Sequence, residues 1–227
     1  MPPRISVVIP ALNEVESIGS VVRSMPWSEI AECIVVDNGS TDATGDVARA
    51  AGARVVTSRR GYGAACAAGS KAAVATSDVL VFLDGDGSDD VSAMAKMVAP
   101  IERGEADFVI GSRMRGKAEP RSLNGAQVFA AKLIGALVKM LYGFRYTDMG
   151  PFRAIRRECL ERMQMREMTF GWNLEMQVKA VKMGLRVVEI PVDYRCRIGG
   201  ESKVSGNLAA SVKAGVRILG VLVRVRS

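Results

Sequence analysis

The chain has 227 residues, of which 48% are hydrophobic, and it carries 31 Lys and Arg against 24 Asp and Glu, with no histidine. This apolar content with a modest net charge excludes an intrinsically disordered chain. The longest uncharged stretches, 61–70 and 122–131, have ten residues each, so no segment is expected to span a bilayer as a helix. The N-terminal Met-Pro-Pro-Arg lacks the apolar core of a signal peptide, so we expect a cytoplasmic protein.

The charge is divided unevenly along the chain. Residues 1–100 have a net charge of −4, and residues 101–227 have a net charge of +11. The basic half favours a small phosphorylated ligand or an anionic membrane, whereas the acidic half argues against nucleic acid as a partner. Because histidine is absent, any proton transfer must use a carboxylate, Tyr, Lys or the substrate itself.

Apolar runs alternate with helix-like patterns through the first 110 residues. The expected strands are Ile5–Ile9, Cys33–Val36, Arg54–Thr57, Val79–Leu83 and Phe108–Ile110. The expected helices between them are Glu14–Ser24, Ala43–Ala51, Gly63–Thr76 and Val91–Ile101. This alternation predicts an α/β fold with a mostly parallel central sheet and helices on both faces. Ligands of such sheets bind beyond the carboxyl ends of the strands, where the polar segments of this half lie: Pro10–Glu14, Asp37–Asp42 and Asp84–Asp90.

After residue 111 the pattern changes. A polar and basic connection, Gly111–Leu123, is followed by helical patterns at Ala126–Leu141, Ile155–Met163 and Trp172–Met183. A loop is expected at Thr147–Arg153, a strand at Leu185–Val192, and a final helix after the loop Asp193–Gly206. No repeat or low-complexity linker interrupts the sequence, so we expect one domain over residues 1–227 with a C-terminal helical elaboration.

The strongest chemical signal is Asp84-Gly-Asp86 at the end of an apolar run. Two carboxylates in this position can face one divalent cation, because Mg²⁺ and Mn²⁺ take carboxylate oxygens together with substrate phosphates. The alternative is an ordinary polar turn. Asp89 and Asp90 are interpreted as capping residues of the next helix, and the four neighbouring carboxylates repel one another unless a cation is bound.

Two more segments, Ile5–Glu14 and Ile34–Asp42, together with Asp84-Gly-Asp86, resemble the inverting family 2 glycosyltransferases of GT-A fold. Further segments are similar to the dolichyl- or polyprenyl-phosphate sugar synthases of that family: Gly111–Arg113, Thr147–Arg156, Gly171–Met176, Glu189–Val192 and Arg195–Lys203. The resemblance implies a GT-A (Rossmann-like) fold in which residues 1–110 bind the nucleotide and residues 111–206 bind the acceptor.

The resemblance also implies roles for individual residues. It assigns nucleotide-sugar binding to Pro10, Ala11, Glu14, Asp37, Asp84, Arg197, Ser202 and Lys203. It assigns a bound Mg²⁺ or Mn²⁺ to Asp84 and Asp86, and catalytic roles to Asp86, Arg113 and Glu175. Two residues depart from the family pattern. Asn38 follows Asp37 where a second Asp is common, and Ser88 stands where lipid-phosphate members often have an amide.

The implied reaction is inverting transfer of a hexose from a GDP-mannose or UDP-glucose type donor to a polyprenyl or dolichyl phosphate at the membrane surface. A phosphate acceptor is already an anion and needs no general base, which suits a chain without histidine. We therefore assign Arg113 and Arg121 to the acceptor phosphate. A hydroxyl acceptor, a sugar nucleotidyltransferase and a non-catalytic nucleotide-binding protein remain as alternatives.

Several local features have two interpretations. Arg59–Gly63 is either a phosphate loop or, as we favour, small-residue packing of a helix on the sheet. Glu175 is either a solvated charge or a residue near the acceptor or in support of a loop, and Asp148 either caps a helix or is functional. The basic, amphipathic segment 207–227 either lies on the inner face of the membrane or packs on the core. A homo-oligomer is left open.

Overall fold

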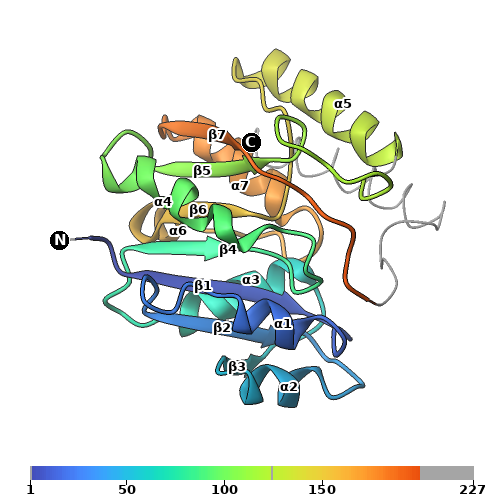
Figure 1. Ribbon diagram of the computed structural model, residues 1–227. Coiled ribbons are helices and arrows are strands. Elements are labelled where there is room, and N and C mark those ends of the chain that lie inside the picture. Colours follow the sequence, from blue (N-terminus) through green and yellow to red (C-terminus); the bar gives the residue numbers. More distant parts are fainter. Residues whose placement is uncertain (1, 124, 200–227) are drawn as a thin grey trace.

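The strands of the computed structural model form one mixed sheet, with residues 2–123 and 125–199 described (Figure 1). The strands in these ranges are β1 (Ile5–Ala11), β2 (Glu32–Asp37), β3 (Arg54–Thr57), β4 (Val79–Phe82), β5 (Phe108–Ser112), β6 (Arg153–Arg156) and β7 (Val187–Pro191). Their order across the sheet is β3-β2-β1-β4-β6-β5-β7. Every neighbouring pair is parallel except those of β6, which runs antiparallel to both β4 and β5. The expected mostly parallel sheet is confirmed.

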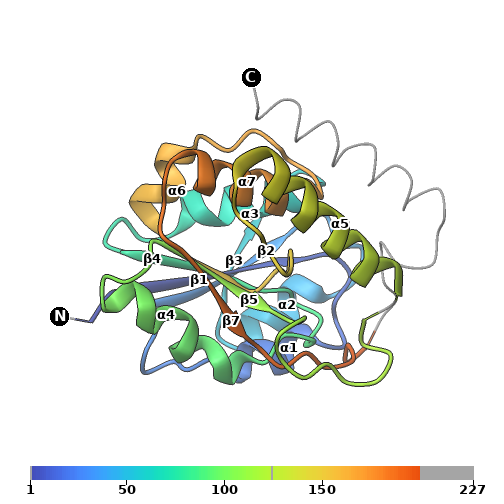
Figure 2. The ribbon, with the colours of Figure 1, turned by 90° about the horizontal axis from the view of Figure 1, so that it is seen from above.

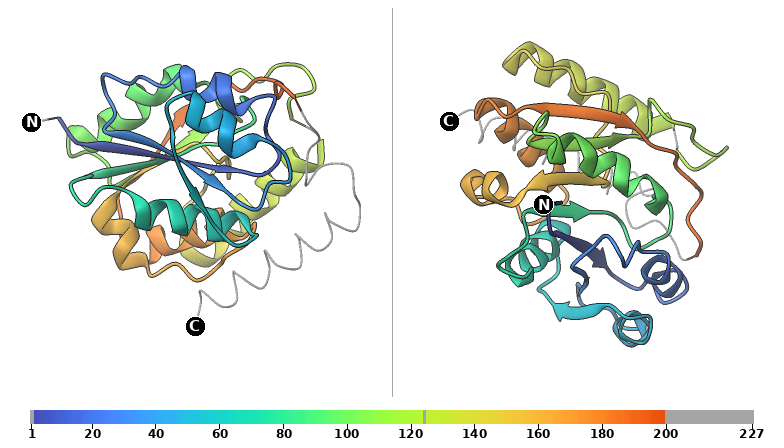
Figure 3. Two further views of the ribbon diagram at one scale, coloured as in Figure 1. Left: turned by 90° about the horizontal axis from the view of Figure 1, so that it is seen from below. Right: turned by 60° about the vertical axis from the view of Figure 1, so that its left-hand side comes forward.

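Helices cover both faces of the sheet, as expected (Figures 2 and 3). One face carries α1 (Ile18–Arg23), α2 (Thr44–Ala50) and α4 (Met94–Glu102), which follows a 3₁₀ turn at Val91–Ala93. The other face carries α3 (Tyr62–Ala72), α5 (Gly125–Tyr142), α6 (Arg157–Met163) and α7 (Trp172–Lys182). Successive side chains of a strand point to opposite faces, so Val7 and Ile9 of β1 enter one core and Val8 enters the other.

Strand β6 lies where the sequence pattern predicted a loop and the start of a helix, so that prediction was wrong. The strand reads Arg-Ala-Ile-Arg, and its short apolar centre, Ala154 and Ile155, gives no recognisable run. It becomes a strand because it pairs with β4 on one side and β5 on the other. Helix α1 also begins at Ile18 rather than at Glu14. The residues before it form a turn in which the backbone N–H groups of Ser17 and Ile18 donate to the Glu14 carbonyl.

The antiparallel β6 determines which loops meet. Because β4 and β5 both oppose β6, they run in the same direction, and the carboxyl ends of β1, β2, β4 and β5 share one edge of the sheet with the start of β6. The polar segments that follow these strands therefore converge at that edge.

Helix α3 packs closely on the sheet at Gly69. A Cβ at this position would overlap Val8 Cγ1 and lie 2.9 Å from Val36 Cγ2. We expect Gly69→Ala to lower the free energy of unfolding by about 1–3 kcal/mol, because the two strands must shift to accept one methyl group. Urea unfolding monitored by circular dichroism measures this. The matched control is Gly125→Ala, since a Cβ at Gly125 meets nothing within 4 Å, and equal effects of the two changes would contradict the prediction.

Candidate active site

A cavity of about 490 Å³ opens at this edge of the sheet. Seven of the residues expected in binding or catalysis line it: Pro10, Ala11, Glu14, Asp84, Asp86, Arg113 and Arg197. Pro10 and Ala11 end β1, and the others come from the loops after β1, β4 and β5 and from the segment after β7. The structure thus brings together groups that are up to 187 residues apart in the chain.

Asp84 and Asp86 follow β4 and reach the cavity on either side of Gly85. The Asp86 carboxylate is oriented by Ser88, whose backbone N–H and hydroxyl donate to Asp86 Oδ1 over 2.9 Å and 2.6 Å. Ser88, which departs from the family pattern, therefore supports the side chain that the pattern singles out.

Burial and crowding raise the pKa values of two carboxyl groups here. Burial, then the charges of Asp89 and Asp86, raise the pKa of Asp84 well above its usual value. Burial is also the main cause that raises the pKa of Asp89 to about 7. The sequence predicted that Asp89 caps the next helix, and this prediction was wrong. Its Oδ2 accepts the backbone N–H of Asp84 at 3.1 Å, and Asp90 alone accepts the Ser92 N–H. Like charges this close favour a compensating cation.

Arg197 supplies positive charge to the same part of the cavity. Its Nη2 lies 3.2 Å from Glu14 Oε1 and 3.5 Å from Asp86 Oδ2, so it bridges the loops after β1 and β4. Two backbone hydrogen bonds hold the segment in place, from Arg195 N to the Ser88 carbonyl and from Ile198 N to the Asp86 carbonyl. A guanidinium in this position can pair with a diphosphate once one enters.

Arg113 is held by a bidentate ion pair to Asp148. Its Nε and Nη2 each lie 2.8 Å from a carboxylate oxygen of Asp148, and its backbone N–H donates to the same group. The side chains of Arg113 and Asp148 are 12% and 0% exposed. Burial lowers the pKa of the Arg113 guanidinium, but the hydrogen bonds and charge of Asp148 outweigh this and raise it, so it stays a cation. The Tyr194 ring, 4.9 Å away, adds a cation–π contact.

Asn38, the second departure from the family pattern, also lines the cavity. It is buried, and its Oδ1 accepts the backbone N–H of Gly61 at 3.0 Å. This bond fixes the loop that brings Arg60 to the cavity wall. The amide of Asn38 positions a neighbouring loop without adding a negative charge beside the acidic residues.

Three of the expected residues do not line the cavity. Asp37 accepts the Ser40 N–H at 2.8 Å at the end of β2, and Arg121 is exposed in the connection before α5. Glu175 is buried on α7, where it binds backbone rather than facing the cavity. Asp148 caps no helix and instead pairs with Arg113. Ser202, Lys203 and the expected helix at 207–227 lie outside the described residues.

Sequence reasoning missed part of the cavity wall. The additional lining residues that bear on the argument are Arg60, Tyr62, Thr169, Phe170 and Tyr194. Arg60 and Tyr62 belong to the segment interpreted as helix–sheet packing, which carried the only sequence signal for this wall. Thr169 and Phe170 follow a Met-rich stretch and have no local pattern that distinguishes them from an ordinary loop.

The carboxylates at the cavity suit a metal ion that takes only some of its ligands from the protein. Among the described residues, no group of three Cys, Asp or Glu side chains is arranged to hold an ion. Asp84 and Asp86 offer hard carboxylate oxygens beside an arginine-lined space, which fits a cation that completes its coordination with phosphate oxygens.

Comparisons with known proteins find similarity to glycosyltransferases over most of the chain. The family model for Glycosyl transferase family 2 matches residues 6–164. An uncharacterized glycosyltransferase of Mycobacterium tuberculosis is 38% identical over 216 residues, which cover 92% of this chain and 94% of that protein. Polyprenol monophosphomannose synthase of Mycolicibacterium smegmatis is 31% identical, with 90% and 82% covered. The solved structure of glucosyl-3-phosphoglycerate synthase from M. tuberculosis, in complex with Mn²⁺, UDP-glucose and phosphoglyceric acid, matches with a TM-score of 0.72 at 25% identity, covering 96% of this chain and 79% of that one.

Proposed function

The chain belongs to glycosyl transferase family 2, and from this premise we propose that it transfers a hexose from a nucleoside-diphosphate sugar to a polyprenyl phosphate. The resemblance found in the motifs and the GT-A fold that it implied are both confirmed. The acceptor, the roles of individual residues and the division into a donor half and an acceptor half are our proposals.

The observation that supports a phosphate acceptor best is the distribution of charge in the cavity. The carboxylates of Glu14, Asp84 and Asp86 line the cavity, and Arg60, Arg113 and Arg197 bring three guanidinium groups to the same space. One diphosphate needs a cation and an arginine or lysine, whereas a donor diphosphate together with an acceptor phosphate needs more positive charge. We assign Arg197 to the donor and Arg113 to the acceptor.

The reaction requires no proton transfer. An oxygen of the acceptor phosphate attacks the anomeric carbon, the bond from that carbon to the diphosphate oxygen breaks on the opposite face, and the nucleoside diphosphate leaves with the electron pair. Arg113 holds the nucleophile, which is already an anion, and Arg197 compensates the charge of the leaving group. Mg²⁺ or Mn²⁺ held by Asp84 and Asp86 would add positive charge at the departing diphosphate.

A lipid acceptor is supported by the surface as well as by the cavity. Helix α5 exposes Phe129, Leu133 and Met140, which share one face of the helix, and Lys132 and Lys139 are exposed on the same helix. An apolar helix face flanked by lysines suits the surface of an anionic membrane. Within the described part of the chain, no helix is long and apolar enough to cross a bilayer. We therefore propose peripheral contact with the membrane.

A donor and acceptor panel tests the proposal. We expect nucleoside diphosphate release and a new glycolipid when the protein, Mn²⁺ and the correct donor are mixed with polyprenyl phosphate in detergent. The unphosphorylated polyprenol should give no product, because it lacks the anion that Arg113 binds. Transfer to 3-phosphoglycerate but not to polyprenyl phosphate would replace the lipid acceptor with a hydroxyl acceptor of the kind named in the solved structure.

A further inference from the structure

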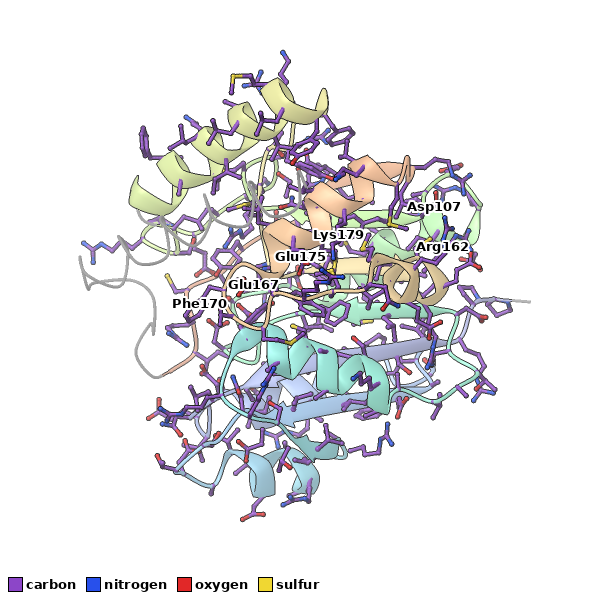
Figure 4. The ribbon with its side chains drawn as sticks, turned by 180° about the vertical axis from the view of Figure 1, so that it is seen from behind. Asp107, Arg162, Glu167, Phe170, Glu175 and Lys179 are labelled. Atoms are coloured by element: carbon purple, nitrogen blue, oxygen red, sulfur yellow. The ribbon has the colours of Figure 1, made fainter. Side chains whose placement is uncertain are left out.

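The loop between α6 and α7 forms one wall of the cavity. Thr169 and Phe170 of this loop line the cavity, and Phe170 is 56% exposed. Figure 4 shows Phe170 at the outer side of this loop, with Glu167 between it and Glu175 of α7. Phe170 therefore offers an apolar surface to a molecule that enters the cavity.

The loop is held from below by one buried carboxylate. Glu175 is only 3% exposed, and it accepts the backbone N–H groups of Arg166 at 3.0 Å and Glu167 at 2.7 Å. Lys179 lies one helical turn further on and pairs with Glu175 at 2.7 Å, while its Nζ also donates to the Gln164 carbonyl at 2.9 Å. The Glu175 carboxylate thus binds the loop backbone at Arg166 and Glu167, and the Lys179 ammonium binds it at Gln164.

The start of α3 holds the loop from the other side. The backbone N–H of Gly63 donates to the Thr169 carbonyl at 3.2 Å, and that of Ala64 donates to the Met168 carbonyl at 2.9 Å. A Cβ at Gly63 would overlap the Glu167 carbonyl oxygen and lie 2.8 Å from Met168 C, so only glycine permits this approach. The small-residue pattern at the start of α3 therefore serves packing, as favoured from the sequence, but the partner is this loop rather than the sheet.

We propose that Glu175 is a positioning residue that fixes the 164–170 loop, so that Phe170 contacts the carbon chain of the acceptor next to its phosphate. The inference rests on the proposed function for the identity of the acceptor. Burying a carboxylate is unfavourable unless it is hydrogen-bonded and paired. The groups that compensate Glu175 are two backbone N–H groups of this loop and Lys179 of α7, which itself donates to the loop. Phe170 shares the cavity with Arg113, which we assign to the acceptor phosphate, so its ring is available to a chain attached to that phosphate.

Glu175→Gln and Phe170→Ala test the two ends of this arrangement. With polyprenyl phosphate, we expect either change to raise the acceptor KM about tenfold, with the donor KM within about twofold of wild type. With a short alkyl phosphate that has no chain to reach Phe170, Phe170→Ala should have no effect. The matched control is Glu161→Gln, which removes an i,i+4 partner of Arg157 on α6 and should leave both KM values unchanged.

Hydrogen exchange separates this inference from the proposed function. In Glu175→Gln, the amides of residues 165–170 should exchange faster while those of β1 and β4 do not change, because the neutral amide holds two N–H groups less strongly. Unchanged exchange in the loop overturns the role of Glu175 for any acceptor. If wild type does not use polyprenyl phosphate, the proposed function and the role of Phe170 both fail, while the exchange result still decides the role of Glu175. A rise in the donor KM equal to that of the acceptor also contradicts the proposal.

Discussion

Asp86→Asn is expected to lower kcat/KM by about a thousandfold, which is the upper end of the effect of removing one group that stabilises the charge developing in a transition state. The change preserves the shape of the side chain and its ability to accept from Ser88. It removes the negative charge that would hold Mg²⁺ or Mn²⁺ and that pairs with Arg197 at 3.5 Å. Nucleoside diphosphate release over a Mn²⁺ titration measures the effect.

The same change should not destabilise the fold. The charge of Asp86 raises the pKa of both Asp84 and Asp89, so removing it relieves repulsion among three carboxyl groups. We expect the melting temperature of Asp86→Asn to equal or exceed that of wild type, and stabilisation by Mn²⁺ with donor to be lost. The control is Asp90→Asn, which keeps a helix-capping side chain. Full activity of Asp86→Asn at low Mn²⁺ would contradict the role that we assign to the metal.

Arg113→Met should abolish transfer and also lower stability by about 3–5 kcal/mol, because it leaves the fully buried Asp148 without its cation. For a chain of this length, that corresponds to a fall in melting temperature of roughly 10 °C. The double variant Arg113→Met with Asp148→Asn should recover most of the stability but none of the transfer. Calorimetry and the transfer assay on the same samples separate the two effects.

An exposed ion pair provides the control for this second prediction. Arg103 and Glu105 pair at 2.8 Å with both side chains more than half exposed, so Arg103→Met should leave both the melting temperature and transfer at their wild-type values. Transfer by the double variant at the wild-type rate would show that Arg113 serves the fold alone, and the acceptor phosphate would then need another binding group.

The elements of the first 110 residues were predictable because their patterns are local. Val79–Phe82 is an apolar run because β4 lies between two strands and between two layers of helices. All residues of such a strand are buried. Strand β6 is equally short and lies beside β4, but it has an arginine at each end, so its identity depends on pairing with β4 and β5. The local sequence pattern does not predict a strand that forms only because neighbouring strands pair with it.

For the candidate site, the sequence by itself determined which carboxylates lie at the ligand-binding edge of the sheet. Asp84 and Asp86 end a recognisable strand, and a strand end in a parallel sheet leads to the ligand-binding edge whatever the remaining fold. Only the tertiary structure decided the partners of the other groups. Asp148 forms an ion pair with Arg113 across 35 residues, Asp89 is buried against the Asp84 backbone, and Glu175 binds the loop of Phe170 and does not line the cavity. The physical reason is that the charge state and role of a buried polar group depend on the partners that burial gives it, and those partners come from distant parts of the chain.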